Sequence, residues 1–108
     1  MNDQDWQLFK SKIGGWQVDY LTRLSAEYVA LLTGDQKPEK KFWQLARKIK
    51  TDQKKAGVSV RLQKSMLVQT LTTLVEEDVI QLADLAEFSP PVQERVTNCY
   101  SAESKEFD

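Results

Sequence analysis

The strongest constraint on the fold is a long series of apolar residues with helical spacing in the first third of the chain. At about 100° per residue, these side chains fall on one face of a helix, within a stripe about 120° wide. The stripe consists of Trp6, Phe9, Ile13, Trp16, Tyr20, Leu24, Tyr28 and Leu31. We therefore predict one helix that begins at a cap on Asn2 or Asp3, runs to about Thr33 and is ended by Gly34.

A second apolar set lies beside this stripe in the later half of the helix. It consists of Val18, Leu21, Val29 and Leu32. Two adjacent apolar stripes predict that this half of the helix contacts two neighbouring helices.

The pair Gly14-Gly15 interrupts the same helix, so a kink or a break here is the alternative to one long helix. Gly14 shares a flank with Leu21 and Leu32, where a missing side chain allows another helix to approach closely. Gly15 projects toward solvent.

Helical periodicity continues along the rest of the chain. Pro38 suits the first turn of a second helix that runs to about Ala56 and stops at Gly57, with an apolar stripe of Phe42, Leu45, Ala46 and Ile49 flanked by Trp43. Ser59 is the expected cap of a third helix to about Glu77, with Val60, Leu67, Leu71 and Leu74 on one stripe. Residues 79–88 predict a turn and a short helix. Ser89, Pro90 and Pro91 then predict a last helix with Val92, Val96, Cys99 and Tyr100 inward.

No segment alternates in the manner of a strand, which predicts an all-α fold. We expect a small bundle of three main helices with one or two short C-terminal helices. Residues 1–100 form a single helical-bundle domain in this interpretation, and residues 101–108 form a polar, frayed tail.

The absence of histidine excludes more functions than any other compositional feature. Mixed Cys/His zinc sites, Ser-His or Cys-His nucleophile pairs and imidazole acid–base chemistry all require it. We therefore expect no catalytic residues, no cofactor and no enzymatic activity. The single cysteine, the absence of a signal-like N-terminus and the absence of a long apolar run predict a cytoplasmic protein without membrane association.

The charge is distributed unevenly along the chain. Residues 37–64 carry 10 basic and 2 acidic side chains, hence +8, whereas residues 66–108 carry 2 basic and 9 acidic, hence −7. On the second helix, Lys40, Arg47 and Lys54 form one strip, and Lys41, Lys48 and Lys55 form another. Both strips are expected opposite the apolar residues, as the solvated face of a bundle helix. Contact with phosphate, or with an acidic protein, is the functional alternative.

Two other groups of residues resemble functional sites, but each has a simpler structural interpretation. Glu76, Glu77, Asp78, Asp84 and Glu87 lack the spacing of a calcium loop and predict a solvated acidic end that faces the lysines of the second helix. Cys99 shares a stripe with Val92 and Val96, so we expect a buried thiol.

Leu62 and Met66 are the best indication of an interface. In a helix that begins at Ser59, they lie four residues apart on the side away from its main stripe. Either the C-terminal helices cover them, which is the favoured interpretation, or they form an exposed patch that binds a partner.

The sequence resembles known protein families in three respects. The segment GVSVRLQKSMLVQTLTTLVEEDVI (57–80) looks like the recognition-helix half of winged-helix regulators, although the flanking residues depart from that pattern. The combination of KFWQLARKIKTDQKKAGV, a Leu-rich helix and DLAEFSPPVQERV resembles a family of short uncharacterised all-helical proteins from Gram-positive bacteria, which implies no activity. The size and helix count are also similar to those of bacteriocin immunity proteins.

The sequence therefore predicts a small bacterial protein of the cytoplasm that acts through protein–protein contacts, with an unknown partner or with itself as a homodimer. Nucleic-acid association through the basic face of the second helix, as in a helix-turn-helix-like regulator, is the alternative.

Overall fold

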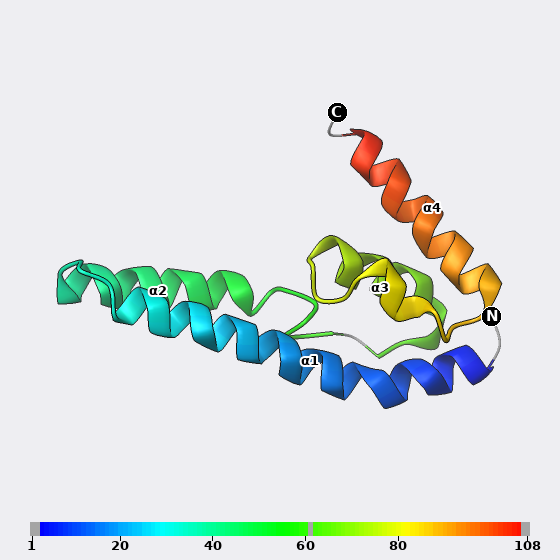
Figure 1. The fold of residues 1–108 in the computed structure, drawn as a ribbon, viewed down its shortest axis with the longest axis horizontal. Helices are drawn as coiled ribbons and strands as arrows, with labels where there is room; N and C mark the ends of the chain where they lie inside the picture. Colours follow the sequence, from blue (N-terminus) through cyan, green and yellow to red (C-terminus); the bar gives the residue numbers. More distant parts are fainter. Residues whose placement is uncertain (1–2, 61, 107–108) are drawn as a thin grey trace.

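The computed structural model describes residues 3–60 and 62–106 and has an all-α fold, as predicted. Its first helix, α1, spans Asp3–Leu32 without a break, so the Gly14-Gly15 pair does not interrupt it (Figure 1). The predicted stripe is confirmed, since Phe9, Ile13, Tyr20 and Leu24 are buried and its other members are partly buried. The expected close approach at Gly14 is wrong for the single chain. A Cβ atom added at Gly14 or Gly15 would meet nothing within 4 Å.

The second helix, α2, spans Pro38–Asp52 and begins at the predicted proline. It ends earlier than the sequence indicated, because residues 53–58 form turns. The N–H groups of Val58 and Ser59 both donate to the carbonyl oxygen of Lys55, at 3.0 and 2.9 Å. Ser59 therefore belongs to this turn and is not the cap of the next helix.

The third helix, α3, spans Leu67–Glu76 and follows a short 3-10 helix, η1, at Lys64–Met66. The predicted start at Ser59 is wrong by eight residues. Side chains on most of the circumference of α3 are buried, namely Leu67, Val68, Leu71, Thr72, Leu74 and Val75. A helix buried to this extent lies at the centre of the core.

The chain leaves α3 through Asp78, whose positive φ of 61° reverses its direction. The predicted turn and short helix at 79–88 are confirmed by a second 3-10 helix, η2, at Leu82–Leu85. The last helix, α4, spans Pro90–Glu106, so helical backbone continues through residues 101–106 of the expected tail. Residues 107 and 108 lie outside the described part of the chain.

The molecule has two parts that share α1 (Figure 1). The N-terminal half of α1 packs with α3, η2 and α4 around one core. The C-terminal half of α1 and the antiparallel α2 form a two-helix projection, which we call the arm (residues 17–52). The Cα radius of gyration is 16.4 Å, whereas a compact chain of this length has about 13 Å. The protein is therefore a helical core with a protruding arm.

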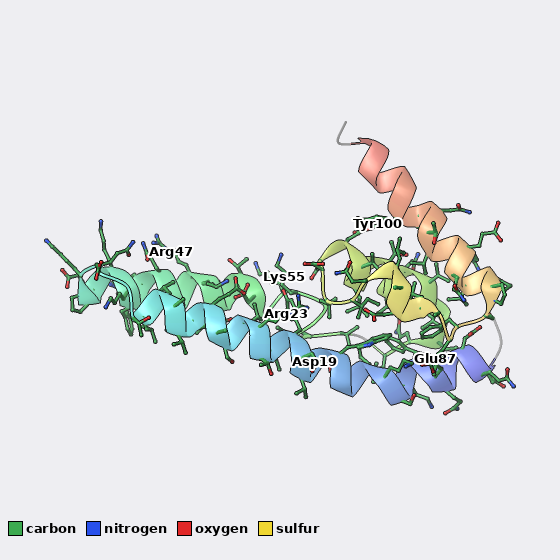
Figure 2. All side chains as sticks on the ribbon, viewed as in Figure 1. Asp19, Arg23, Arg47, Lys55, Glu87 and Tyr100 are labelled. Carbon is green, nitrogen blue, oxygen red and sulfur yellow. The ribbon has the colours of Figure 1, made fainter. Side chains whose placement is uncertain are left out.

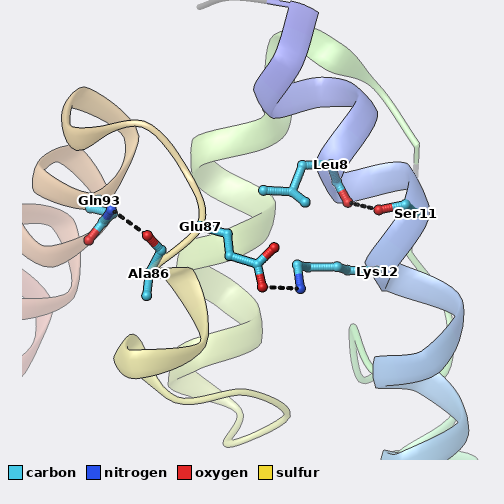
Figure 3. Close-up of polar contacts among 6 residues, drawn as sticks. All are labelled: Leu8, Ser11, Lys12, Ala86, Glu87 and Gln93. Atoms are coloured by element: carbon cyan, nitrogen blue, oxygen red, sulfur yellow. Dashed lines mark hydrogen bonds and ion pairs between the residues drawn. The ribbon is translucent and has the colours of Figure 1, made fainter.

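Polar contacts, one of them buried, hold together α1, the segment before α4 and α4 itself. Asp5, only 4% exposed, accepts hydrogen bonds from the N–H and the hydroxyl of Ser89, at 2.9 and 2.6 Å. About two turns further along α1, Lys12 forms an ion pair with Glu87 at 3.2 Å (Figure 3). The same close-up shows Gln93 of α4 donating to the carbonyl of Ala86. These contacts join the first and last helices across the whole sequence.

Three segments meet at Gly57, where the arm joins the core. Its backbone lies so close to Tyr20 of α1 that an added Cβ would come within 2.3 Å of the ring and within 2.8 Å of Val79. Beside it, the Ala56 N–H donates to the Glu77 carboxylate at 2.9 Å. The glycine is required here for close packing, and not only to stop a helix.

We expect Gly57→Ala to destabilise the protein, because the ring of Tyr20 and the side chain of Val79 must move. Overpacking of this kind costs about 1–3 kcal/mol. The matched control is Gly15→Ala, which has open space and should stabilise α1 by about 0.5–1 kcal/mol. Urea unfolding measures both changes, and a Gly57→Ala variant as stable as the wild type would contradict the packing at this junction.

Candidate functional site

Polar side chains hold the two helices of the arm together. The buried carboxylate of Asp52 accepts a hydrogen bond from the Tyr28 hydroxyl at 2.8 Å and lies 3.3 Å from the Lys48 ammonium. Lys48 also lies 3.5 Å from a carboxylate oxygen of Glu27 and 5.6 Å from the centre of the Tyr28 ring. These contacts fix which face of α1 meets which face of α2.

The environment of this cluster raises two pKa values. Burial, followed by the hydrogen bond to Asp52, raises the pKa of Tyr28 to about 12. Burial alone would lower the pKa of Lys48, but its contacts with Asp52 and Glu27 outweigh burial, and the pKa is raised. Both groups therefore keep their protons at neutral pH. A cluster of this kind holds helices together and is poorly suited to exchanging protons with a substrate.

The two basic strips of α2 differ in their surroundings. Lys40, Arg47 and Lys54 are exposed, as predicted, and Figure 2 labels Arg47 on the outside of α2. Lys41, Lys48 and Lys55 are only half-exposed, so the prediction of a fully solvated strip is wrong for them. The reason is that α2 is rotated about its axis: it turns the strip containing Lys48 toward α1 and turns Phe42 outward.

Two residues of the acidic end have partners outside α2. Glu87 pairs with Lys12 of α1, and Glu77 accepts the N–H of Ala56. Lys48 of α2 pairs with Glu27 and Asp52. None of these contacts joins the acidic end to a lysine of α2, in contrast to the prediction.

Leu62 and Met66 are exposed, at 54% and 40%, so the expectation that the C-terminal helices cover them is wrong. They also do not share a helix face. Leu62 lies in the segment before η1, and Met66 is the last residue of η1. Their exposure leaves them as candidate partner contacts, without the helical spacing on which the prediction rested.

A larger apolar surface lies on the arm. We call it the arm patch, and it consists of Val18, Leu21, Val29 and Leu32 of α1 with Phe42 and Trp43 of α2. These side chains are between 43% and 62% exposed. The prediction of a second neighbour for the α1 residues is wrong within one chain, and so is the prediction that Phe42 points inward. The aromatic pair is packed edge to face, with ring centres 5.0 Å apart.

Helix geometry places five of the six residues of the arm patch, all but Trp43, on one side of the arm. The contacts of Tyr28 and Glu27 with α2 define the inner face of α1, and Val18, Leu21, Val29 and Leu32 lie about 100° around the helix from it. Because α2 runs antiparallel, Phe42 lies about 90° from its own inner face in the matching direction. Trp43 lies a further 100° around α2, nearly opposite the inner face of that helix and next to Arg47. The arm is thus apolar on one side, and its other sides carry charged residues together with Trp43.

A cavity of about 580 Å³ lies between α3 and α4. It is lined by Lys64, Ser65, Val68, Gln69, Arg95 and Cys99. Cys99 is exposed here, so the prediction of a buried thiol is wrong. α4 covers α3 with Val92 and Val96, both 3% exposed or less, and leaves Cys99 at the edge of the contact. Lys64 is already engaged in an ion pair with Asp3.

The helix-turn-helix interpretation does not fit the placement of α3. Residues 53–63, which separate α2 from η1, contain no helix in their described part, whereas a recognition helix follows its partner after a short turn. α3 is also buried on most sides, so it presents no free face to a DNA groove. Arg61 lies outside the described residues.

Comparisons with family models, with curated proteins and with solved structures found no match for this chain. No helix within residues 3–60 and 62–106 is long and apolar enough to cross a membrane. In the same part of the chain, no three His, Cys, Asp or Glu side chains gather closely enough to hold a metal ion. The arm patch is therefore the feature from which a function can be argued.

Stability at alkaline pH tests the polar cluster of the arm. Tyr28 keeps its proton to about pH 12 in the folded chain, whereas a tyrosine in an unfolded chain loses it near about pH 10. The stabilisation that depends on this proton is fully present below about pH 10 and is lost as the pH rises toward 12. The free energy of unfolding should fall over this window, and it should fall less in Tyr28→Phe.

The fall is not abolished in Tyr28→Phe, because burial also raises the pKa of Tyr20. Urea unfolding at a series of pH values gives the slopes. Equal slopes for the wild type and Tyr28→Phe would contradict the contact with Asp52.

Proposed function

We propose that the protein is a non-enzymatic interaction protein of the cytoplasm that acts by placing the arm patch against the surface of another protein chain. The observation that carries this proposal is the cluster of six large apolar side chains, each at least 43% exposed, on the arm. Single exposed apolar residues are ordinary, but a contiguous apolar patch of several hundred Å² is rare on a protein that works alone.

The shape of the molecule supports the same conclusion. Beyond Leu24 the arm adds little to the core, because the buried core residues of α1 end there and α2 has its main helix contact with α1. A two-helix unit alone is a marginal structure in water. A partner that covers the arm patch would supply the second layer that such a unit lacks.

The titratable groups of the arm have a structural role. Tyr28, Lys48 and Asp52 form a cluster between α1 and α2 with its hydrogen bonds satisfied inside the protein. Its raised pKa values favour stable protonation over proton transfer.

A photo-reactive amino acid at position 29 tests this proposal in an extract of the cells that make the protein. Val29 lies in the arm patch, and the neighbouring Ala30 is exposed on the other side of α1. We expect a covalent adduct with a protein, whether another copy or a different chain, from position 29 and none from position 30. No adduct from position 29, or equal adducts from both positions, would refute the proposed function.

Nucleic-acid contact is a second candidate, because Lys40, Arg47 and Lys54 are all exposed on α2. Such a strip could lie along phosphates, and binding would weaken steeply with salt. Acidic residues share the charged side of the arm, however, including Asp19 of α1 (Figure 2). This mixture of charges favours the solvated interpretation.

A gel-shift assay at two salt concentrations distinguishes the interpretations. If the strip is only solvated surface, the wild type and a triple variant with Lys40→Ala, Arg47→Ala and Lys54→Ala should both leave duplex and single-stranded nucleic acid unshifted at about 0.15 M salt. A shift that the triple variant abolishes would instead establish the nucleic-acid function.

A further inference from the structure

We infer that the occupant of the arm patch is a second copy of this chain, which pairs with the first so that two arms form an antiparallel four-helix bundle. This inference rests on the proposed function, since it names the partner of the same surface. Three observations lead to it: the spacing of the patch, its charge and its size.

The spacing is that of a helix–helix seam. Along the outer side of α1, small and apolar residues recur at intervals of three or four, namely Gly14, Val18, Leu21, Ser25, Val29 and Leu32. Intervals of this kind are the pattern with which helices pack along their length. Neither glycine of α1 has a neighbour within 4 Å of its missing Cβ, so the close approach that Gly14 permits is unused within one chain.

The charge of this side allows two identical surfaces to meet. Between positions 18 and 32, the outer side of α1 carries Val18, Leu21, Thr22, Ser25, Val29 and Leu32, and none of these is ionisable. Two copies can therefore face each other there without bringing like charges together. The exposed cations of α2, Lys40 and Arg47, lie on the opposite side of the arm and stay in water after pairing.

The size of the patch is what a dimer of this kind needs. A fully exposed aromatic side chain has about 150–250 Å² and an aliphatic one has less, so exposed fractions of 43–62% leave roughly 100 Å² on each of the five side chains that share one side of the arm. Two copies together would bury on the order of 1,000 Å² from these side chains, and the smaller residues around them add to it. Stable interfaces bury about 1,200–2,000 Å² in total.

Symmetry favours a second copy over a different protein. A two-fold axis places the same patch on both sides of the contact, so neither arm keeps an uncovered apolar side. Two layers of two antiparallel helices also make a four-helix bundle, in which every helix gains a buried stripe. The two apolar stripes of α1 then each have a neighbour: α2 in the same chain, and the arm of the second copy.

Sedimentation equilibrium of the purified full chain tests the inference. From about 1 µM to about 500 µM, we expect a monomer–dimer equilibrium with the dimer dominant at the upper end. Val29→Glu should weaken dimerisation at least about a hundredfold, because the two-fold axis buries two added carboxylates in one apolar contact. Ala30→Glu, which changes an exposed residue on the other side of the same turn, should leave dimerisation within about threefold of the wild type.

Circular dichroism of both variants, recorded at a concentration where the wild type is monomeric, should show the helical content of the wild type, because both positions are exposed in the single chain. A wild type that stays monomeric throughout the concentration range would overturn the inference. So would a dimer that Val29→Glu and Ala30→Glu weaken equally, or one that Val29→Glu leaves intact. If the wild type is monomeric while position 29 still cross-links to a different protein, the proposed function is supported. Only the inference that the partner is a second copy of this chain is then rejected.

Discussion

The contact of Tyr20 with Gly57 and Val79 determines how the rest of the molecule is arranged. Tyr20 lies where α1 leaves the core, Gly57 lies where the chain returns from the arm, and Val79 lies at the end of α3. Arg23 strengthens this junction: its guanidinium donates to the carbonyl of Val79 at 3.1 Å and lies over the Tyr20 ring. Because all three segments meet at one aromatic ring, the direction of the arm relative to the core is fixed by packing and not by a linker.

Several elements could be predicted from the sequence because a single local pattern determines each of them. The stripe from Trp6 to Leu31 predicted α1 correctly, and Pro38 predicted where α2 begins. The start of α3 could not be predicted in the same way. Ser59 is a good cap by residue type, but it lies in the turn that packs Gly57 against Tyr20, and the described residues that follow it directly are not helical, so it has no helix to cap. Tertiary contact overrides local preference at this position.

The candidate site was predicted in one respect and missed in another. The apolar residues Val18, Leu21, Val29 and Leu32 predicted that a second helix packs against α1. The sequence alone could not show that this helix does not come from the same chain. For α2, the pattern placed Phe42 inside, whereas the helix is rotated so that Lys48 reaches Glu27 and Asp52. The spacing of apolar residues does not indicate a long-range ion pair of this kind, so the rotation of α2 could not be predicted from it.

The division into core and arm also separates two kinds of constraint on the sequence. Replacing Leu71 or Val96, which are fully buried, changes the stability of the single chain directly. Replacing Val18, Val29 or Trp43, each at least 60% exposed, removes little buried area from it. Folding of one chain therefore provides almost no selection for apolar residues at these positions. Mutational tolerance measured for folding and mutational tolerance measured for function should diverge along the arm, although both are recorded on the same helix.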